Sequence, residues 1–393
     1  MEGKVLIKDF DYNLAEDKIA QSAAEPRDSS KLLLYSKGQI SDKVFSSLPE
    51  LLPDNSSLYF NNAKVIPARI FLKNSNAATI EVFLLQPYKM EHVQALNAKE
   101  TCVWSCLIGN KKKWKPEEIL EIEIEGTRIQ LRQIEDLVVE FKWQSGLAFV
   151  ELLEKIGKLP LPPYIKHEAN AEDAGRYQTV YSKIQGSVAA PTAGLHFTQT
   201  VLNEIAKKGI SQNYVTLHVS AGTFLPVKVE DARAHDMHQE IYSVNRAEIE
   251  AILDGKQIVA VGTTSTRVLE SLFWAGVNLI DKKENPFKIE QFVYESRKEF
   301  TLEESMRAIL NYLNENSIEA VYGETSIMII PGYRFRVVKG LITNFHQPKS
   351  TLLLLISAFI GDSWKTVYAH ALENGYRFLS YGDSSLLLPK RIF

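Results

Sequence analysis

The stretch QIVAVGTTSTRVLESLFWAG, residues 257–276, decides the fold class that the sequence predicts. Its first part, QIVAVG, is a short apolar run of the kind that forms a buried strand. Its second part, TSTRVLESLFWAG, has helical apolar spacing, so a strand and a helix follow each other directly. The alternation continues to the C-terminus, where TLEESMRAILNYLNEN begins with a capping box of Thr301 and Glu304. Such alternation is typical of an α/β domain.

The region from Ile70 to Val150 has a different pattern. Its apolar residues alternate over short segments between turns, and helical spacing is scarce. The segment EIEIEGTRIQ predicts a hairpin that turns at Gly126-Thr127. We therefore predict a mixed α/β body with an inserted all-β, barrel-like domain. Residues 1–67 and 152–393 would form the body, and residues 68–151 the insertion.

Composition restricts the function classes. The chain of 393 residues carries 45 basic and 48 acidic residues, a net charge of −3, so it is not a globally basic nucleic-acid binder. Cys102 and Cys106 are its only cysteines, which excludes a disulfide framework and indicates a reducing compartment. The most apolar run, TLLLLISAFIG at 351–361, is too short to span a membrane and predicts a buried helix. Since the first residues lack a signal-type apolar core, we expect a soluble, cytoplasmic protein.

The run AAPTAGLHF, residues 189–197, fits neither helical nor strand periodicity. Gly194 can adopt backbone angles that other residues avoid, and a helix is predicted to begin after Thr198. A glycine-bearing loop before a helix N-terminus presents free N–H groups to a ligand. We therefore take Thr192, Gly194 and His196 as candidate binding residues, with an ordinary tight turn as the alternative.

Other stretches share this mixture of Gly, Thr, His and aromatic residues. They are TLHVSAGTFLPV (216–227), VGTTSTRVLES (261–271), ITNFHQPKSTLLLL (342–355) and YRFLSYGD (376–383). They fall where strands and helices are expected to connect. In open α/β sheets the ligand crevice lies at the carboxyl ends of the strands, so we expect these stretches to converge on one crevice.

The start of the helix after QIVAVG is a candidate anion site. Hydroxyls and free N–H groups at Thr263 and Thr264 can hold a carboxylate or a phosphate, and Arg267 can add a bidentate contact. The alternative is a helix cap with a surface arginine. The glycine-rich motifs of dinucleotide and nucleoside-triphosphate sites are missing from the sequence.

Several histidines are candidates for proton transfer, because imidazole accepts protons near neutral pH. His346 lies in a turn before a predicted helix. His218 ends a strand-like run and equally fits a hydrogen-bonded core group. His235, His238 and Glu240 have a spacing that can ligate a metal, but a polar loop near a substrate or a solvated loop fits better, so we predict no metal site.

The basic run KKKWK, residues 111–115, can contact phosphates while Trp114 stacks on a base. A solvated loop is the more common meaning of such a run, and we favour that interpretation.

Taken together, these segments resemble the S-adenosylmethionine:tRNA ribosyltransferase-isomerase family of queuosine biosynthesis. The segments that carry the resemblance are FNNAKVIPARI, LPLPPYI, RYQTVYSK, VAAPTAGLHF, TLHVSAGTFLPV, GTTSTRVLES, LITNFHQPKSTLLLLISAF and YRFLSYGD. They follow the family's order from Phe60 to Asp383. The resemblance is weak across the β region and the first 30 residues.

The resemblance implies an α/β body with an inserted β-barrel and a reaction on tRNA that carries 7-aminomethyl-7-deazaguanine at the wobble position. The ribosyl group of S-adenosylmethionine moves onto the aminomethyl group and is isomerised, which gives epoxyqueuosine-tRNA, adenine and methionine. The sulfonium acidifies the ribosyl 5′-carbon, so a base can remove a proton there. S-adenosylmethionine is then a consumed co-substrate, and no metal or redox cofactor is needed.

This chemistry assigns roles to the candidate residues. We expect His346 or His218 to be the base and Asp383 to pair with the substrate amine. The expected pocket residues are Thr192, Gly194, His196, Thr263, Thr264 and Arg267. The expected partners are tRNA and S-adenosylmethionine, with no membrane, and the expected state is a monomer.

The chain departs from the family's usual residues at a few positions. Ala63-Lys64 stands where a Thr-Arg pair is common, Ala234 where Glu is usual, and Ser384 where Ala is usual. A non-catalytic or substrate-altered relative that binds RNA or a nucleoside therefore stays open as an alternative. A methyltransferase that uses S-adenosylmethionine is less favoured, because the sequence lacks a glycine-rich first turn.

Overall fold

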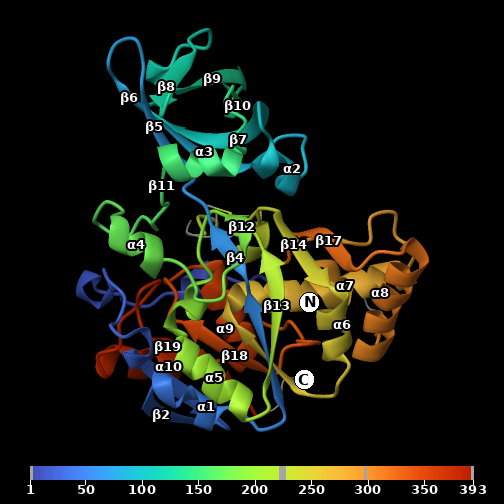
Figure 1. Ribbon diagram of the computed structural model, residues 1–393. Coiled ribbons are helices and arrows are strands. Elements are labelled where there is room, and N and C mark those ends of the chain that lie inside the picture. The colour runs from blue at the N-terminus through green and yellow to red at the C-terminus, as the bar shows by residue number, and fades with distance from the viewer. Residues whose placement is uncertain (1–2, 221–226, 296–298, 391–393) are drawn as a thin grey trace.

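Two sheets dominate the computed structural model, which describes residues 3–220, 227–295 and 299–390 (Figure 1). Figure 1 shows a lower body around the larger sheet and an upper lobe around the smaller one. Both α-helices and strands build the body, so the predicted mixed α/β class is confirmed. The boundaries predicted for an inserted domain, 68–151, stay a prediction.

The larger sheet is mixed and has the strand order β16-β17-β14-β13-β3-β15-β18-β19-β1-β2. In chain order its strands are β1 (Lys31–Ser36), β2 (Gln39–Val44), β3 (Ser56–Asn61), β13 (Ser211–Leu217), β14 (Glu240–Asn245), β15 (Gln257–Val261), β16 (Lys288–Ile289), β17 (Ala320–Thr325), β18 (Gly340–Asn344) and β19 (Ser384–Leu388). The strands β13, β3, β15 and β18 run parallel to one another, so their carboxyl ends lie at one edge.

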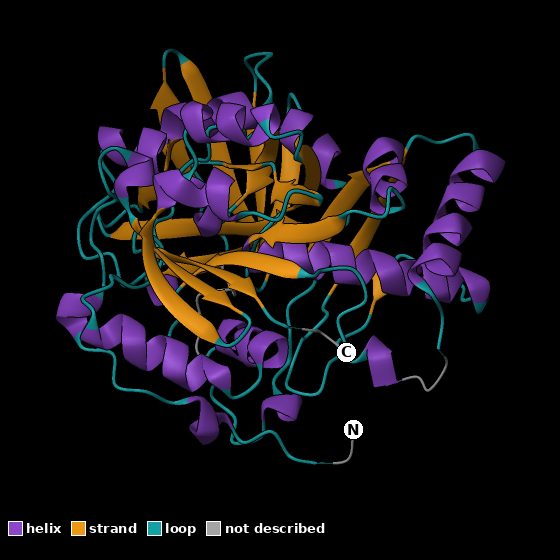
Figure 2. Cartoon of the chain, turned by 90° about the horizontal axis from the view of Figure 1, so that it is seen from below, coloured by secondary structure: helices purple, strands orange, loops and turns teal. Residues whose placement is uncertain are grey.

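The central strands of this sheet are buried on both faces. Along β3, Leu58 and Phe60 pack in one hydrophobic cluster, whereas Tyr59 between them packs in another. Such continuous apolar runs are typical of parallel strands that helices cover on both sides. Figure 2 shows these helices on either side of the strands.

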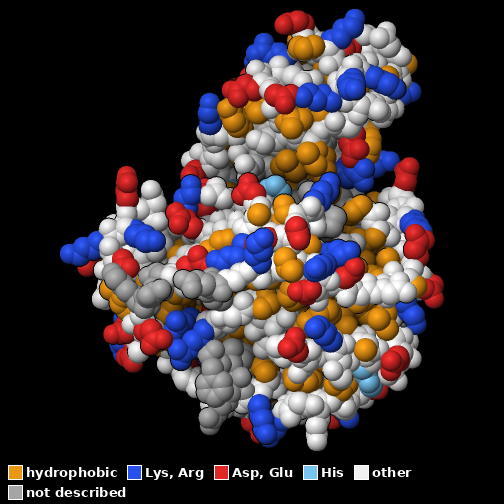
Figure 3. Space-filling view, turned by 180° about the vertical axis from the view of Figure 1, so that it is seen from behind, with side chains coloured by type: hydrophobic (Ala, Val, Ile, Leu, Met, Phe, Trp, Pro, Cys, Tyr) orange, Lys and Arg blue, Asp and Glu red, His pale blue; other side chains and the backbone are white. Residues whose placement is uncertain are grey.

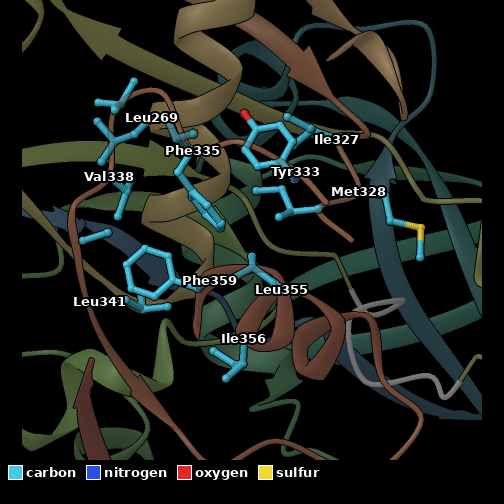
Figure 4. Close-up of a cluster of buried hydrophobic side chains, with 14 of the residues drawn as sticks. Leu269, Ile327, Met328, Tyr333, Phe335, Val338, Leu341, Leu355, Ile356 and Phe359 are labelled. Carbon is cyan, nitrogen blue, oxygen red and sulfur yellow. The ribbon is translucent and has the colours of Figure 1, made fainter. Parts of the chain in front are cut away.

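The helices of the body divide between the two faces of the sheet. Helix α5 packs on the face of Leu58, and α7 packs on the opposite face. The body helices are α1 (Leu48–Leu51), α4 (Ala171–Arg176), α5 (Gln199–Lys207), α6 (Arg246–Ile252), α7 (Gly262–Ile280), α8 (Leu302–Asn316), α9 (Thr351–Ile360) and α10 (Ser363–Glu373). Figure 4 shows how Leu269 of α7 and Phe359 of α9 belong to one apolar cluster with Phe335.

Helix α9 confirms the predicted buried helix. Ser350 caps it by accepting a hydrogen bond from the backbone N–H of Leu353 at 3.2 Å, and the helix ends before Gly361. Among the described residues, no single helix is long and apolar enough to cross a membrane. The helices α9 and α10 reach that length and composition only as a pair bent by 115°.

The upper lobe contains an antiparallel sheet with its own apolar core. Its order is β11-β5-β6-β7-β10-β9-β8, and its strands are β5 (Arg69–Lys73), β6 (Thr79–Pro87), β7 (Thr101–Gly109), β8 (Leu120–Ile124), β9 (Thr127–Glu135), β10 (Val138–Trp143) and β11 (Gly157–Lys158). Helices α2 (His92–Asn97) and α3 (Phe149–Ile156) cover it, and α2 was not expected from the sequence. A separate two-stranded sheet pairs β4 (Ala63–Val65) with β12 (Ile184–Ser187).

One detail of the upper lobe corrects an expectation, and another supports the interpretation that we favoured. The predicted hairpin exists, but Ile124 pairs with Thr127, so the turn lies at Glu125–Gly126, one residue earlier than expected. Trp114 is buried, and its indole N–H donates to the carbonyl of Glu118 at 2.8 Å. Its ring is therefore not free to stack on a base, which leaves the lysines of 111–115 as a solvated run.

Histidines packed away from water make stability depend on pH. Burial lowers the pKa of His92 and His196 to about 4 and that of His218 and His346 to about 3. In the unfolded chain their pKa is about 6.5. Between these values the unfolded chain binds protons that the folded chain does not, so stability rises with pH. Acidification from pH 6.5 to 4 therefore favours unfolding.

We expect the free energy of unfolding to fall by about 1.4 kcal/mol per pH unit for each such histidine below pH 6.5. His92→Phe removes one proton site, so it should reduce the pH slope by about that amount. Urea unfolding from pH 7 to 5 measures the slope independently of any constant cost of the substitution. His370→Gln, near the surface, is the control and should leave this contribution in place. An unchanged slope in His92→Phe would contradict the argument.

Candidate functional site

The carboxyl ends of β15 and β18 open into a cavity of about 70 Å³ that we call the threonine cavity. Its walls come from residues 189–193, 262–264 and 343–347, with Tyr164 and Ser380. The segments that follow two parallel strands thus meet the run AAPTAGLHF at one edge of the sheet. The expected convergence on one crevice is confirmed for these segments.

Polar groups without partners face this region. The hydroxyl of Thr264 is buried and has no hydrogen-bond partner among the residues that the structure describes. Helix α7 begins here without a side-chain cap, so the N–H groups of its first turn have no partner within the helix. A buried polar atom without a partner is costly, so these groups are suited to a ligand that supplies one.

One histidine, His346, lines the threonine cavity. Its Nε2 lies 2.9 Å from the hydroxyl of Thr343, and its backbone N–H donates to the hydroxyl of Tyr368 at 3.0 Å. Burial lowers the pKa of His346 to about 3, so the imidazole is neutral at pH 7. A neutral imidazole has a lone pair with which it can accept a proton.

A second cavity, of about 30 Å³, lies beside the first, and we call it the arginine chamber. Arg267 of α7 and Glu240 of β14 form a buried ion pair in its wall, and Ser220 lies beside them. The backbone N–H of Ser220 donates to Glu240 at 3.0 Å, and Nε of Arg267 donates to the carbonyl of Ile327 at 3.2 Å. Leu352 lines both cavities, so they are neighbours.

A larger groove of about 900 Å³, the interlobe groove, separates the upper lobe from the body. Residues of the upper lobe such as Arg69 and Phe83 line one side, and residues 236–239 and 288–291 of the body line the other. Figure 3 shows the narrowing between the lobes from behind. Since Ser220 also belongs to the arginine chamber, the groove leads toward the two smaller cavities.

The structure brings together part of the expected site. Thr192, Thr263, Thr264 and His346 line the threonine cavity, and Arg267 lies in the adjacent chamber. Arg267 is not the surface residue of the alternative interpretation, because only 6% of its surface is exposed.

Gly194 and His196 lie behind the cavity wall. The ring of His196 is buried, and its Nδ1 is 2.8 Å from the hydroxyl of Ser30. Gly194 does not use the backbone angles that only glycine favours. It is needed for space, because a Cβ there would lie 1.9 Å from the hydroxyl oxygen of Tyr181.

His218 and Asp383 do not line the threonine cavity or the arginine chamber. His218 stacks on His92 with ring centroids 4.4 Å apart, at the junction of the two lobes. Asp383 is buried and accepts hydrogen bonds from the backbone N–H groups of Lys31 at 3.0 Å and Arg377 at 2.8 Å. The catalytic roles expected for both stay predictions that these contacts do not favour.

Sequence reasoning missed some lining residues and one partner. Tyr164 and Ser380 belong to segments that the sequence singled out, but nothing marked them individually. The partnership of Arg267 with Glu240 joins positions 27 residues apart, and no local pattern indicates it. In TLHVSAGTFLPV, residues 221–226 lie outside the described residues.

Comparisons with known proteins give a consistent match over both lobes. A family model described as queuosine biosynthesis protein matches residues 7–387. A protein of Treponema denticola named S-adenosylmethionine:tRNA ribosyltransferase-isomerase is 38% identical over 98% of this chain and 100% of its own length. A protein of Rhodospirillum rubrum with the same name is 40% identical over 96% of each chain. A solved S-adenosylmethionine tRNA ribosyltransferase from Thermotoga maritima, 27% identical, aligns with a TM-score of 0.47 over 96% of this chain and 99% of its own.

Gly194→Ala tests whether the wall behind the cavity positions its polar groups. The added methyl group must displace Tyr181 or the backbone of 192–196, so we expect a loss of about 1–3 kcal/mol in stability and weaker ligand binding. Urea unfolding measures the first, and calorimetric titration with S-adenosylmethionine the second. Gly175→Ala is the matched control, because its Cβ meets no atom within 4 Å. Equal behaviour of the two variants would contradict the packing argument.

Proposed function

This chain belongs to the queuosine biosynthesis protein family, and from that premise we propose that it catalyses the S-adenosylmethionine:tRNA ribosyltransferase-isomerase reaction. The observation that carries the proposal is the match to relatives of this name over nearly their whole length. The substrate is tRNA with 7-aminomethyl-7-deazaguanine at the wobble position, and the products are epoxyqueuosine-tRNA, adenine and methionine. The chain acts as a transferase and isomerase in one site.

In this proposal the threonine cavity receives the ribosyl part of S-adenosylmethionine. The hydroxyls of Thr192, Thr263 and Thr264 and the free N–H groups of α7 hold its polar atoms. A cavity of about 70 Å³ is smaller than the volume a nucleoside needs, so the adenosyl group extends beyond it on its open side.

The base is His346, which removes a proton from the ribosyl 5′-carbon next to the sulfonium. It lines the threonine cavity, so it lies where a proton acceptor for the bound ribosyl group must lie. His218 is not retained as the base, because its ring stacks on His92 away from the cavity. Asp383 is not retained as the partner of the substrate amine, because its carboxylate already accepts two backbone N–H groups.

The bonds that change define the reaction balance. Loss of the 5′ proton forms a double bond between C4′ and C5′ as the bond from C4′ to the ring oxygen breaks. The ring oxygen becomes an aldehyde oxygen on C1′, and adenine leaves from C1′ and takes up a proton. The aminomethyl nitrogen of the tRNA base then adds to C4′ and gives up a proton, and C5′ attacks the aldehyde carbon to close the carbocycle. The resulting oxyanion on C1′ forms the epoxide C–O bond to C5′ as the C–S bond breaks, which releases methionine.

We further propose a domain arrangement, an oligomeric state, a compartment and a cofactor requirement for this protein. The upper lobe is an inserted barrel-like domain of residues 68–151. The protein acts as a cytoplasmic monomer, and S-adenosylmethionine is consumed without a metal or redox cofactor. The non-catalytic, RNA-binding alternative is less favoured, because the unpartnered Thr264 hydroxyl and the neutral His346 equip the cavity for chemistry.

Release of adenine tests the function directly. The purified chain is mixed with S-adenosylmethionine and tRNA that carries the aminomethyl base, and adenine is followed by chromatography. We expect adenine and methionine in equal amounts, and none when the tRNA carries ordinary guanine. Treatment of the protein with a chelator, which is then removed, should leave the rate unchanged. Binding of both substrates without adenine release would support the non-catalytic alternative.

His346→Ala tests the base. Loss of a positioned base should lower single-turnover adenine release by about two or more orders of magnitude. Affinity for S-adenosylmethionine, measured separately, should change much less. His370→Ala, on the surface of α10, is the control and should stay within about twofold of the wild type. Near-normal turnover in His346→Ala would remove this residue from the mechanism.

A further inference from the structure

The arginine chamber contains a buried pair of opposite charges with donor capacity left over. Arg267 and Glu240 are exposed by only 8% and 3% at their side chains, and one Nη of Arg267 holds the carboxylate. The other nitrogen, Nη2, is buried and has no hydrogen-bond partner among the described residues. Within the same described ranges, the hydroxyl of Ser220, in the same wall, also lacks one. These atoms indicate a site that is complete only when a ligand is bound.

The charges of the pair select the kind of ligand. Arg267 and Glu240 compensate each other, so a phosphate or a simple carboxylate would bring uncompensated negative charge beside Glu240 into a water-poor chamber. A zwitterion adds no net charge. Its carboxylate can accept from Nη2 of Arg267 while its ammonium donates to the carboxylate of Glu240. The α-amino acid group is the common zwitterion with both charges on one carbon.

The size and place of the chamber fit the same group. A volume of about 30 Å³ has room for roughly two water-sized groups by this measure. Leu352 lines both the chamber and the threonine cavity, so one extended ligand can occupy both. Thr351, at the first turn of α9, lies in the chamber wall and adds a hydroxyl.

We propose that the arginine chamber binds the amino acid end of S-adenosylmethionine, with Arg267 on its carboxylate and Glu240 on its ammonium. This assignment rests on the proposed function, since it names the subsite for one end of that substrate. It also gives a specific role to Glu240, which the sequence placed with His235 and His238 in a polar loop near a substrate or in a solvated loop.

Two neutral thioether ligands isolate this end of the molecule. S-adenosylhomocysteine carries the amino acid group, whereas 5′-methylthioadenosine has a methyl group in its place, and both share the adenosine. We expect wild type to bind the first about tenfold or more tightly than the second, because charged hydrogen bonds carry the difference. Calorimetric titration or competition gives the ratio of the two dissociation constants.

Substitutions in the chamber should remove this ratio without abolishing adenosine binding. Arg267→Met should bring the two affinities within about threefold of each other. Because a single change leaves a buried charge unpaired, the double variant Arg267→Met, Glu240→Gln tests the same point in a chamber without net charge. Thr264→Val, in the threonine cavity, should weaken both ligands equally and preserve the ratio. Arg334→Met, at an exposed arginine, should change neither affinity.

The outcomes separate this inference from the function on which it rests. A ratio that survives in both chamber variants, or a wild type that binds the two ligands equally, would overturn the inference alone. A wild type that binds neither ligand would overturn the proposed function together with it. A ratio lost in the chamber variants and kept in Thr264→Val would establish the subsite.

Discussion

Burial of the parallel strands on both faces is the constraint on which the site depends. Every side chain of β3 and β18 is buried, and so is most of β15, and the middle of each of these strands is formed mainly by apolar residues. Polar residues appear where the strands end. Thr263 and His346 follow directly after such strands, at the same edge. The hydrophobic effect that packs the sheet therefore also determines where chemistry can occur.

Local signals in the sequence predicted the elements well, because each has a short-range physical cause. The apolar run before Gly262 is β15, and the apolar run at 351–361 contains helix α9. The loops around the threonine cavity were also found, since turn residues after apolar runs mark the carboxyl ends of strands. Their convergence followed from the geometry of parallel strands rather than from any single residue.

Contacts between segments that are distant in the sequence could not be predicted from such local signals. The sequence suggested that Gly194 is needed for its backbone angles. In the structure it is needed because the hydroxyl of Tyr181, which only the tertiary fold brings near, leaves no space for a side chain. From the sequence, His218 was a candidate for the catalytic base, but its ring stacks on His92 of the upper lobe. The burial of Arg267 on helix α7 depends on Glu240 of strand β14. In each case the partner, not the residue, decides the role.

The charge state of the site links its chemistry to the stability of the fold. A sulfonium cation that binds beside a protonated imidazole would meet a like charge in a medium of low dielectric constant. Burial keeps His346 neutral and so removes that repulsion, and the compensated pair of Arg267 and Glu240 adds no net charge either. Because of the same burial, the unfolded chain takes up protons at a higher pH than the folded chain does, so a fall in pH favours unfolding. If the threonine cavity receives the sulfonium as proposed, the burial that avoids repulsion of this cation also makes the fold sensitive to acid, because both properties follow from the exclusion of water around His346.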